Sequence, residues 1–175
     1  MAATEKVRGR VIDAHSHIGT MEAWQFYDLK EPVKPTVYEF ARAKDYLDHL
    51  DGVGVERGLV LPNYGIPVQS HAFDLNELVL DSVASQDRLV GGLWVSFLPQ
   101  NKEMTRKALD QAGEAGIVAL KTTFLLGGNP DPHTWDDETR EIAEACFDAA
   151  ERHDLVFHFH TSAGGTSDIN NYIPM

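Results

Sequence analysis

Val11-Ile12-Asp13-Ala14-His15-Ser16-His17-Ile18-Gly19 leads a short β-branched, apolar segment into two histidines separated by one residue. Because side chains alternate between the faces of a strand, Asp13, His15 and His17 are expected on one face. Two neutral imidazoles side by side at a strand end are a ligand pair that suits zinc and similar metals. Asp13 would then accept a hydrogen bond from a ligand imidazole. A pair of solvent-facing loop histidines is the alternative, and the position at a strand end favours the metal pair.

The composition describes an acidic chain that is long enough for one domain over residues 1–175, with 1–9 as a flexible lead-in. The chain has 15 Lys or Arg against 27 Asp or Glu, a formal net charge of −12. That charge argues against nucleic acid or an anionic membrane as a partner. The sequence shows no run of membrane-spanning length and no signal-peptide region. Its one cysteine, Cys146, excludes an internal disulfide. A cytoplasmic protein is therefore expected.

Apolar runs and helical periodicities alternate along the chain after residue 10. Five strands are expected, at about 10–14, 58–62, 89–95, 117–121 and 155–160. Four helices are expected between them: one from a capping box at Thr36 and Glu39 to Gly52, then 71–86, 103–115, and one from a capping box at Thr134 and Asp137 to Arg152. Buried strands that alternate with helices indicate a parallel sheet built from right-handed crossovers.

The places of the polar residues favour a (β/α)8 barrel of the TIM type, of which about the first five units are present. Barrel enzymes put their chemistry at the C-terminal ends of the strands. Four candidate site residues fall at such ends: His15, His17, Lys121 and His160. The sequence has neither a G-x-G-x-x-G turn nor a P-loop, which removes the main support for a doubly wound nucleotide-binding sheet.

The fifth expected strand carries the third candidate ligand. Alternation puts His158 and His160 on the face opposite Phe157 and Phe159, so His160 lies at the rim beside the first histidine pair. His158, one layer below, is more simply a buried, hydrogen-bonded histidine. Lys121 also points inward and can reach the site, where an ordinary lysine is a simpler state than a carbamylated metal bridge.

The expected loop 19–35 follows the histidine pair directly and is rich in aromatic residues. Trp24 and Phe26 are candidate substrate-binding residues in a lid over the metal. Packing of these rings against the fold is an equally simple interpretation for either residue.

The quoted stretch resembles the opening of the amidohydrolase superfamily, specifically family 2, the relatives of aminocarboxymuconate-semialdehyde decarboxylase. Further segments resemble that family's second to fifth strands: 52–60, 89–93, 116–121 and 155–162. The resemblance implies a (β/α)8 barrel with a divalent metal, usually zinc, held by His15, His17 and His160. It also implies a later strand histidine and a late aspartate, which this chain does not reach. A companion polypeptide or a missing C-terminal portion is therefore expected to complete the barrel.

The leading functional hypothesis is a metal-dependent hydrolase that acts on a small, cyclic or carboxylated substrate through metal-activated water. A non-oxidative decarboxylase of an aromatic or unsaturated carboxylic acid is the first alternative, and the sequence does not separate the two. The second alternative is a half-barrel subunit that needs a companion chain for activity. In either enzyme His160 and Lys121 are the expected catalytic residues.

Overall fold

The sheet of this protein contains five parallel strands in sequence order. A computed structural model describes residues 10–19, 40–62, 71–124, 128–161 and 168. The strands are β1 (Ile12–Ile18), β2 (Arg57–Pro62), β3 (Leu89–Trp94), β4 (Ile117–Thr122) and β5 (Val156–Phe159). The helices are α1 (Ala43–Val53), α2 (His71–Ser85), α3 (Lys102–Asp110) and α4 (Asp137–Arg152). Each strand pairs in parallel with the next one along the chain, so each crossover carries a helix.

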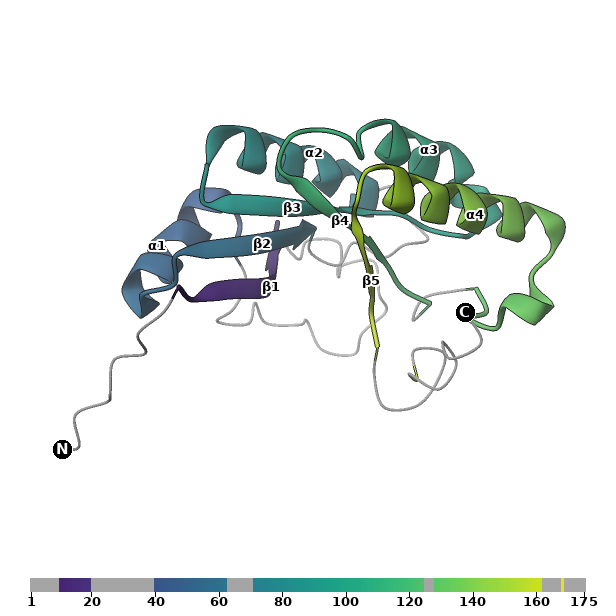
Figure 1. Ribbon diagram of the computed structural model, residues 1–175, viewed down its shortest axis with the longest axis horizontal. Coiled ribbons are helices and arrows are strands. Elements are labelled where there is room, and N and C mark those ends of the chain that lie inside the picture. Colours follow the sequence, from purple (N-terminus) through teal and green to yellow (C-terminus); the bar gives the residue numbers. More distant parts are fainter. Residues whose placement is uncertain (1–9, 20–39, 63–70, 125–127, 162–167, 169–175) are drawn as a thin grey trace, which may run out of the picture.

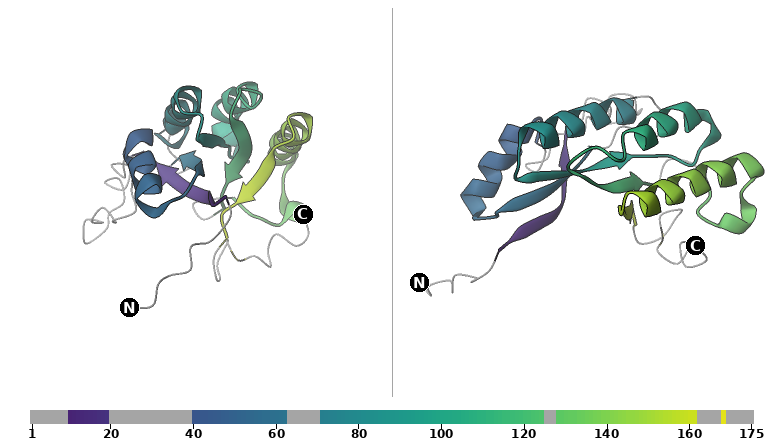
Figure 2. Two further views of the ribbon diagram at one scale, coloured as in Figure 1. Left: turned by 60° about the vertical axis from the view of Figure 1, so that its left-hand side comes forward. Right: turned by 45° about the horizontal axis from the view of Figure 1, so that its top comes forward.

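The helices cover one face of the sheet. In Figure 1, α2, α3 and α4 lie above the strands, and the left view of Figure 2 shows the four helices as an outer arc around them. This curled arrangement of β/α units is part of a (β/α)8 barrel and confirms the expected fold class. In the part of the chain that the structure describes, no helix is long and apolar enough to cross a membrane.

The middle strands are buried on both faces, as their unbroken apolar runs predict. Val60 and Leu61 on β2, and Leu93 and Trp94 on β3, are neighbours that point to opposite faces, and each of these four residues is at most 2% accessible to solvent. On β5, the aromatic side chains turn toward the helices: the Phe157 ring centroid lies 5.0 Å from that of Phe147 on α4. The alternating histidines of β5 are therefore left on the opposite, concave face.

Two element boundaries differ from the prediction near the N-terminus. β1 continues to Ile18, so both histidines lie within the strand. α1 begins only at Ala43, because Phe40 forms a β-bridge with Ile18 and does not start a helical turn. The predicted capping box before it lies outside the described residues. The helix ends against Gly54, whose φ of 77° provides the left-handed cap.

The N-terminus of α4 is capped by Asp136 and not by the predicted Thr134. The Asp136 carboxylate accepts the backbone N–H of Thr139 at 2.7 Å. Thr134 belongs to a preceding short 3-10 helix, Pro132–Thr134, where its hydroxyl donates to the carbonyl oxygen of Asp131 at 2.8 Å. A hydroxyl already satisfied by its own turn does not compete for the helix N–H groups.

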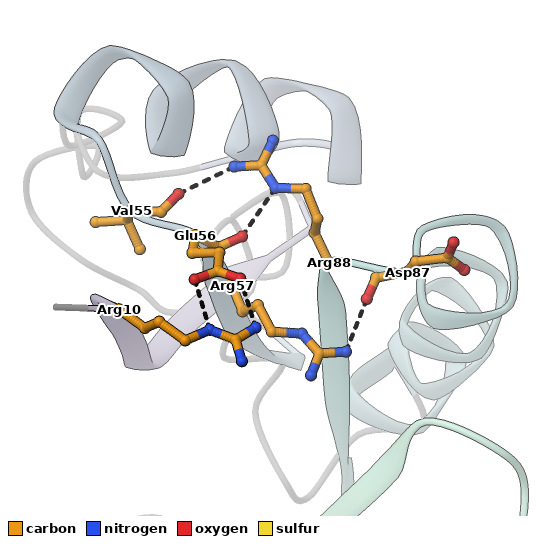
Figure 3. A network of polar contacts seen from close by, with 6 residues as sticks. All are labelled: Arg10, Val55, Glu56, Arg57, Asp87 and Arg88. Atoms are coloured by element: carbon orange, nitrogen blue, oxygen red, sulfur yellow. Dashed lines mark hydrogen bonds and ion pairs between the residues drawn. The ribbon is translucent and has the colours of Figure 1, made fainter.

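Ion pairs and backbone contacts tie together the N-terminal ends of β1, β2 and β3. Arg10 Nε donates to the Glu56 carboxylate at 2.8 Å, which joins the start of β1 to the residue before β2. Arg88, just before β3, donates to the carbonyl oxygens of Glu56 and Val55 at 2.9 and 3.0 Å (Figure 3). Arg88 also pairs with the Asp51 carboxylate on α1 at 2.6 Å.

Candidate active site

His15 and His17 meet at the C-terminal end of β1. Their Nε2 atoms lie 3.0 Å apart, and their ring planes are inclined at 62°. His17 Nδ1 lies 2.9 Å from the carbonyl oxygen of Pro62, the last residue of β2. Because a carbonyl oxygen only accepts, this contact places the His17 proton on Nδ1 and leaves the Nε2 lone pair facing His15.

The spacing of this histidine pair fits two adjacent positions around one metal ion. Two nitrogens bound to a tetrahedral zinc at 2.0–2.1 Å lie roughly 3.3 Å apart. The carbonyl that orients His17 is the kind of partner that usually fixes a ligand imidazole. Among the described residues, no three His, Cys, Asp or Glu side chains gather into a group that could hold a metal. The role of His160 as the third ligand therefore stays a prediction.

The sheet curls enough to bring its first and fifth strands together on the concave face. The His158 ring centroid lies 4.6 Å from that of His15, and the two rings are nearly perpendicular at 88°. Burial and the charge of Lys121 lower the pKa of His158 to about 4. The backbone N–H of His160 donates to the carbonyl oxygen of Thr122 at 2.9 Å, which continues the pairing one residue beyond β5.

His158 thus lies in the candidate site, although the sequence interpretation preferred a structural role for it over metal ligation. Its alternation with His160 was the available signal, since it placed both imidazoles on the concave face. The contact with His15 depends on the curl of the sheet and could not be read from the spacing.

Lys121 is a buried cation beside the histidines. Its side chain is 1% exposed, and it lies in register between Trp94 on β3 and His158 on β5. Burial lowers the pKa of Lys121 to about 8. The lysine charge in turn lowers the pKa of four imidazoles: His15, His17, His158 and His160. For His17, burial is the larger cause and brings the pKa to about 4. The neutral imidazoles that result are in the state that binds a metal.

Asp13 supports the backbone of the pair and does not bind an imidazole, contrary to the expectation from the sequence. One carboxylate oxygen accepts the backbone N–H of His15 at 3.0 Å. The other accepts the hydroxyl groups of Tyr46 at 2.8 Å and Ser16 at 3.2 Å. Trp24 and Phe26 lie outside the described residues, and their place in the site stays a prediction.

An amidohydrolase family model matches residues 12–170. This chain belongs to the amidohydrolase family. Members of the family generally use a divalent metal. The comparison with curated protein sequences gave no match.

Several solved structures share the fold of this amidohydrolase chain. The IDCase of Metarhizium anisopliae in its apo form gives a TM-score of 0.62 at 15% identity, covering 87% of this chain and 50% of that one. The 2,6-dihydroxybenzoate decarboxylase from Rhizobium gives 0.61 at 14%, with 93% and 53% covered. A probable 2-pyrone-4,6-dicarboxylic acid hydrolase from Acinetobacter baumannii, with citric acid bound, gives 0.51 at 15%, with 87% and 50% covered. The chain spans about half the length of these proteins.

Proposed function

We propose that this chain carries the metal-binding part of an amidohydrolase active site and acts on a small, carboxylated substrate. His15 and His17 are assigned as ligands of a divalent metal, zinc in the first instance, with His160 as the third. The 3.0 Å separation of the two Nε2 atoms carries this assignment, together with the orientation of His17 by Pro62. Three protein ligands are the count of a catalytic zinc, which keeps one position open. When bound, the metal would activate water or polarise a substrate oxygen.

Lys121 is assigned the electrostatic and proton-transfer work of the site. Its ammonium group attracts a carboxylate in surroundings where the neighbouring imidazoles are neutral. With a pKa of about 8, Nζ keeps its proton at neutral pH yet releases it more readily than an exposed lysine does. His160, at the rim, would act on the reacting group of the substrate through the metal that it is proposed to hold.

Hydrolysis is the first reaction proposed, and decarboxylation of an aromatic or unsaturated acid is the alternative. Lys121 supports the alternative, because the carbon that loses CO2 must take up a proton and this buried ammonium group can supply it. Incubation of the metal-loaded protein with 2-pyrone-4,6-dicarboxylate and with 2,6-dihydroxybenzoate separates the two. Loss of the pyrone ring absorbance without CO2 supports hydrolysis, and release of CO2 supports decarboxylation. Turnover that continues undiminished after metal is removed by a chelator would contradict both.

The metal assignment is tested by elemental analysis of the purified protein after loading with Zn2+. We expect His15→Ala to lose bound zinc while keeping its helical circular dichroism. His153→Ala is the matched control, because this exposed histidine caps α4 at the opposite end of the sheet. Equal zinc content in His15→Ala and the unaltered protein would show that the ligand assignment is wrong.

The remaining strands of the barrel are proposed to come from further polypeptide, either a companion chain or a continuation of this one. In the described sheet, β1 and β5 are each paired on one side only. Both strands also expose apolar side chains on their faces, with Ile12 58% and Val156 66% accessible. Native mass spectrometry of the untagged protein from its source would test this. A larger polypeptide or a hetero-complex is expected, and a 19.4 kDa monomer with full metal-dependent turnover would contradict it.

Trp24 and Phe26 are proposed as substrate-binding residues in the segment that follows the histidine pair. Trp24→Ala should then raise KM or lower kcat while bound metal is unchanged. Unaltered kinetics would assign the ring to packing instead.

A further inference from the structure

The buried tyrosine of α1 reaches across to the histidine strand. Tyr46 is completely inaccessible to solvent, and its hydroxyl donates to the Asp13 carboxylate at 2.8 Å. Its ring lies 5.0 Å from that of Phe40. The hydroxyl occupies space that a side chain at Gly58 of β2 would fill, since a Cβ there would overlap Tyr46 Oη. Glycine at position 58 thus leaves the space beside β2 that the Tyr46 hydroxyl needs to reach Asp13.

Asp13 receives this hydroxyl at the point where the pairing of β1 with β2 is interrupted. Asp13 pairs with Gly58 and Ser16 with Val60, so β1 has one extra residue between these pairs. Such a bulge leaves a residue outside the ladder and turns its side chain to a new direction. The Asp13 carboxylate binds the His15 N–H that lies within this interruption.

The bulge changes which side chains of β1 share a face. Asp13 pairs with Gly58 and Ser16 with Val60, so the bulge puts Asp13 on the same face as Ser16, toward Tyr46. His17 lies on the opposite face, where its Nε2 atom is 3.0 Å from that of His15. The His15 ring also lies against the His158 ring on β5, with their centroids 4.6 Å apart. The hydrogen bond from the His15 N–H to the Asp13 carboxylate therefore fixes the part of the backbone from which the His15 ring projects.

We propose that Tyr46 and Asp13 are positioning residues for the histidine pair, because the chain Tyr46 hydroxyl, Asp13 carboxylate, His15 N–H holds the β1 bulge in the shape that brings His15 Nε2 to His17 Nε2. The inference rests on the proposed metal site and adds to it a residue from α1 that touches neither metal nor substrate. A role in fold stability alone would leave the metal affinity unchanged. A positioning role instead predicts a lower metal affinity although the same histidine ligands are present.

The test measures Co2+ affinity by competition with a chromophoric chelator and records the Co2+ absorption spectrum of the bound protein. Tyr46→Phe removes one oxygen atom and keeps the ring. We expect its Co2+ dissociation constant to rise roughly three- to tenfold, which is less than the ten- to hundredfold effect of removing a group bound directly to a ligand imidazole, because Tyr46 acts through Asp13. We also expect the ligand-field bands to shift.

Thr105→Val is the matched control for lost stability. Thr105 lies on α3. Its buried hydroxyl accepts the N–H of Ser96, in the connection after β3, at 3.0 Å and donates to the Ser96 carbonyl oxygen at 2.9 Å. Both variants should unfold at lower temperature, but Thr105→Val should keep Co2+ affinity within about twofold. An affinity for Tyr46→Phe that also stays within about twofold would overturn the positioning role.

Two further variants keep the inference testable if Tyr46→Phe does not fold. Asp13→Asn retains an oxygen for the His15 N–H and should lose less Co2+ affinity than Asp13→Ala. Equal affinities for these two variants and the unaltered protein would contradict the inference. If instead His15→Ala binds Co2+ as tightly as the unaltered protein, the proposed metal site itself fails, which is a separate outcome.

Discussion

The two ends of the sheet hold their charges in different ways. At the N-terminal end, Arg10 and Arg88 each bind a carboxylate in exposed ion pairs. At the C-terminal end, Lys121 is buried among imidazoles whose pKa values burial and the lysine charge both lower. Exposed ion pairs change the free energy of folding little, because water solvates both charges. A buried ammonium group among imidazoles that can also become charged opposes folding. The difference indicates that the first end holds the strands together, and the second is arranged for a ligand that brings negative charge.

The largest effect is expected from replacing the buried cation of the C-terminal end. Lys121→Met should lower kcat/KM roughly a hundredfold or more, since it removes the proposed acid. It should also raise the free energy of unfolding by roughly 2 kcal/mol, because the burial that lowers the pKa of Lys121 to about 8 opposes its charge. Assays with saturating metal and urea unfolding measure the two quantities. A variant that is both less stable and fully active would show that Lys121 stabilises the fold and takes no part in the reaction.

Acidification should lower the free energy of unfolding of the metal-free protein, through the histidines at the C-terminal end of the sheet. Burial lowers the pKa of His17 to about 4 from 6.5, so the unfolded chain takes up this proton first. The neutral state of His17 therefore makes its full contribution to the free energy of unfolding above pH 6.5. This contribution, roughly 1–3 kcal/mol, is lost as the pH falls from 6.5 toward 4. Urea unfolding across this range, in the presence of a chelator, measures the loss. We expect a smaller loss in His17→Asn, and an identical loss would show that another group is responsible.

A smaller effect is expected at the N-terminal end, from Arg88→Met. This change removes the hydrogen bonds to the Glu56 and Val55 carbonyl oxygens and the ion pair with Asp51. We expect the free energy of unfolding to fall by roughly 1–2 kcal/mol while Zn2+ content and kcat stay unchanged. Loss of zinc in this variant would mean that the two ends are coupled.

The smallest effect is expected from Glu56→Gln, which keeps the shape of the side chain and removes its charge. The Arg10–Glu56 pair is exposed, and Arg10 lowers the pKa of Glu56. We expect the unfolding midpoint to change by about 1–2 °C in low salt, and by less in high salt, where the charges are screened. A change that is independent of salt would indicate that the hydrogen bonds matter and the charge does not.

The ion-paired end and the histidine end also differ in how far the sequence predicts them. The histidines at strand ends, and their alternation with Phe157 and Phe159 on β5, follow from a period of two residues that any strand imposes. No comparable pattern marks Arg10 or Arg88 as partners of carboxylates elsewhere in the chain. Exposed charges carry no periodic signal, because solvent accepts them in many arrangements.

What the sequence determined by itself was the alternation of strands and helices, the parallel sheet, and the concave face for His158 and His160. These follow from local periodicity, since burial of one face of each element repeats every two or 3.6 residues. Only the tertiary structure decided the bulge in β1, the contact of His158 with His15, and the hydrogen bond from Tyr46 to Asp13, which are 33 residues apart. These contacts depend on how far the sheet curls and on where Gly58 lets a phenol approach, and both are set by packing among distant elements.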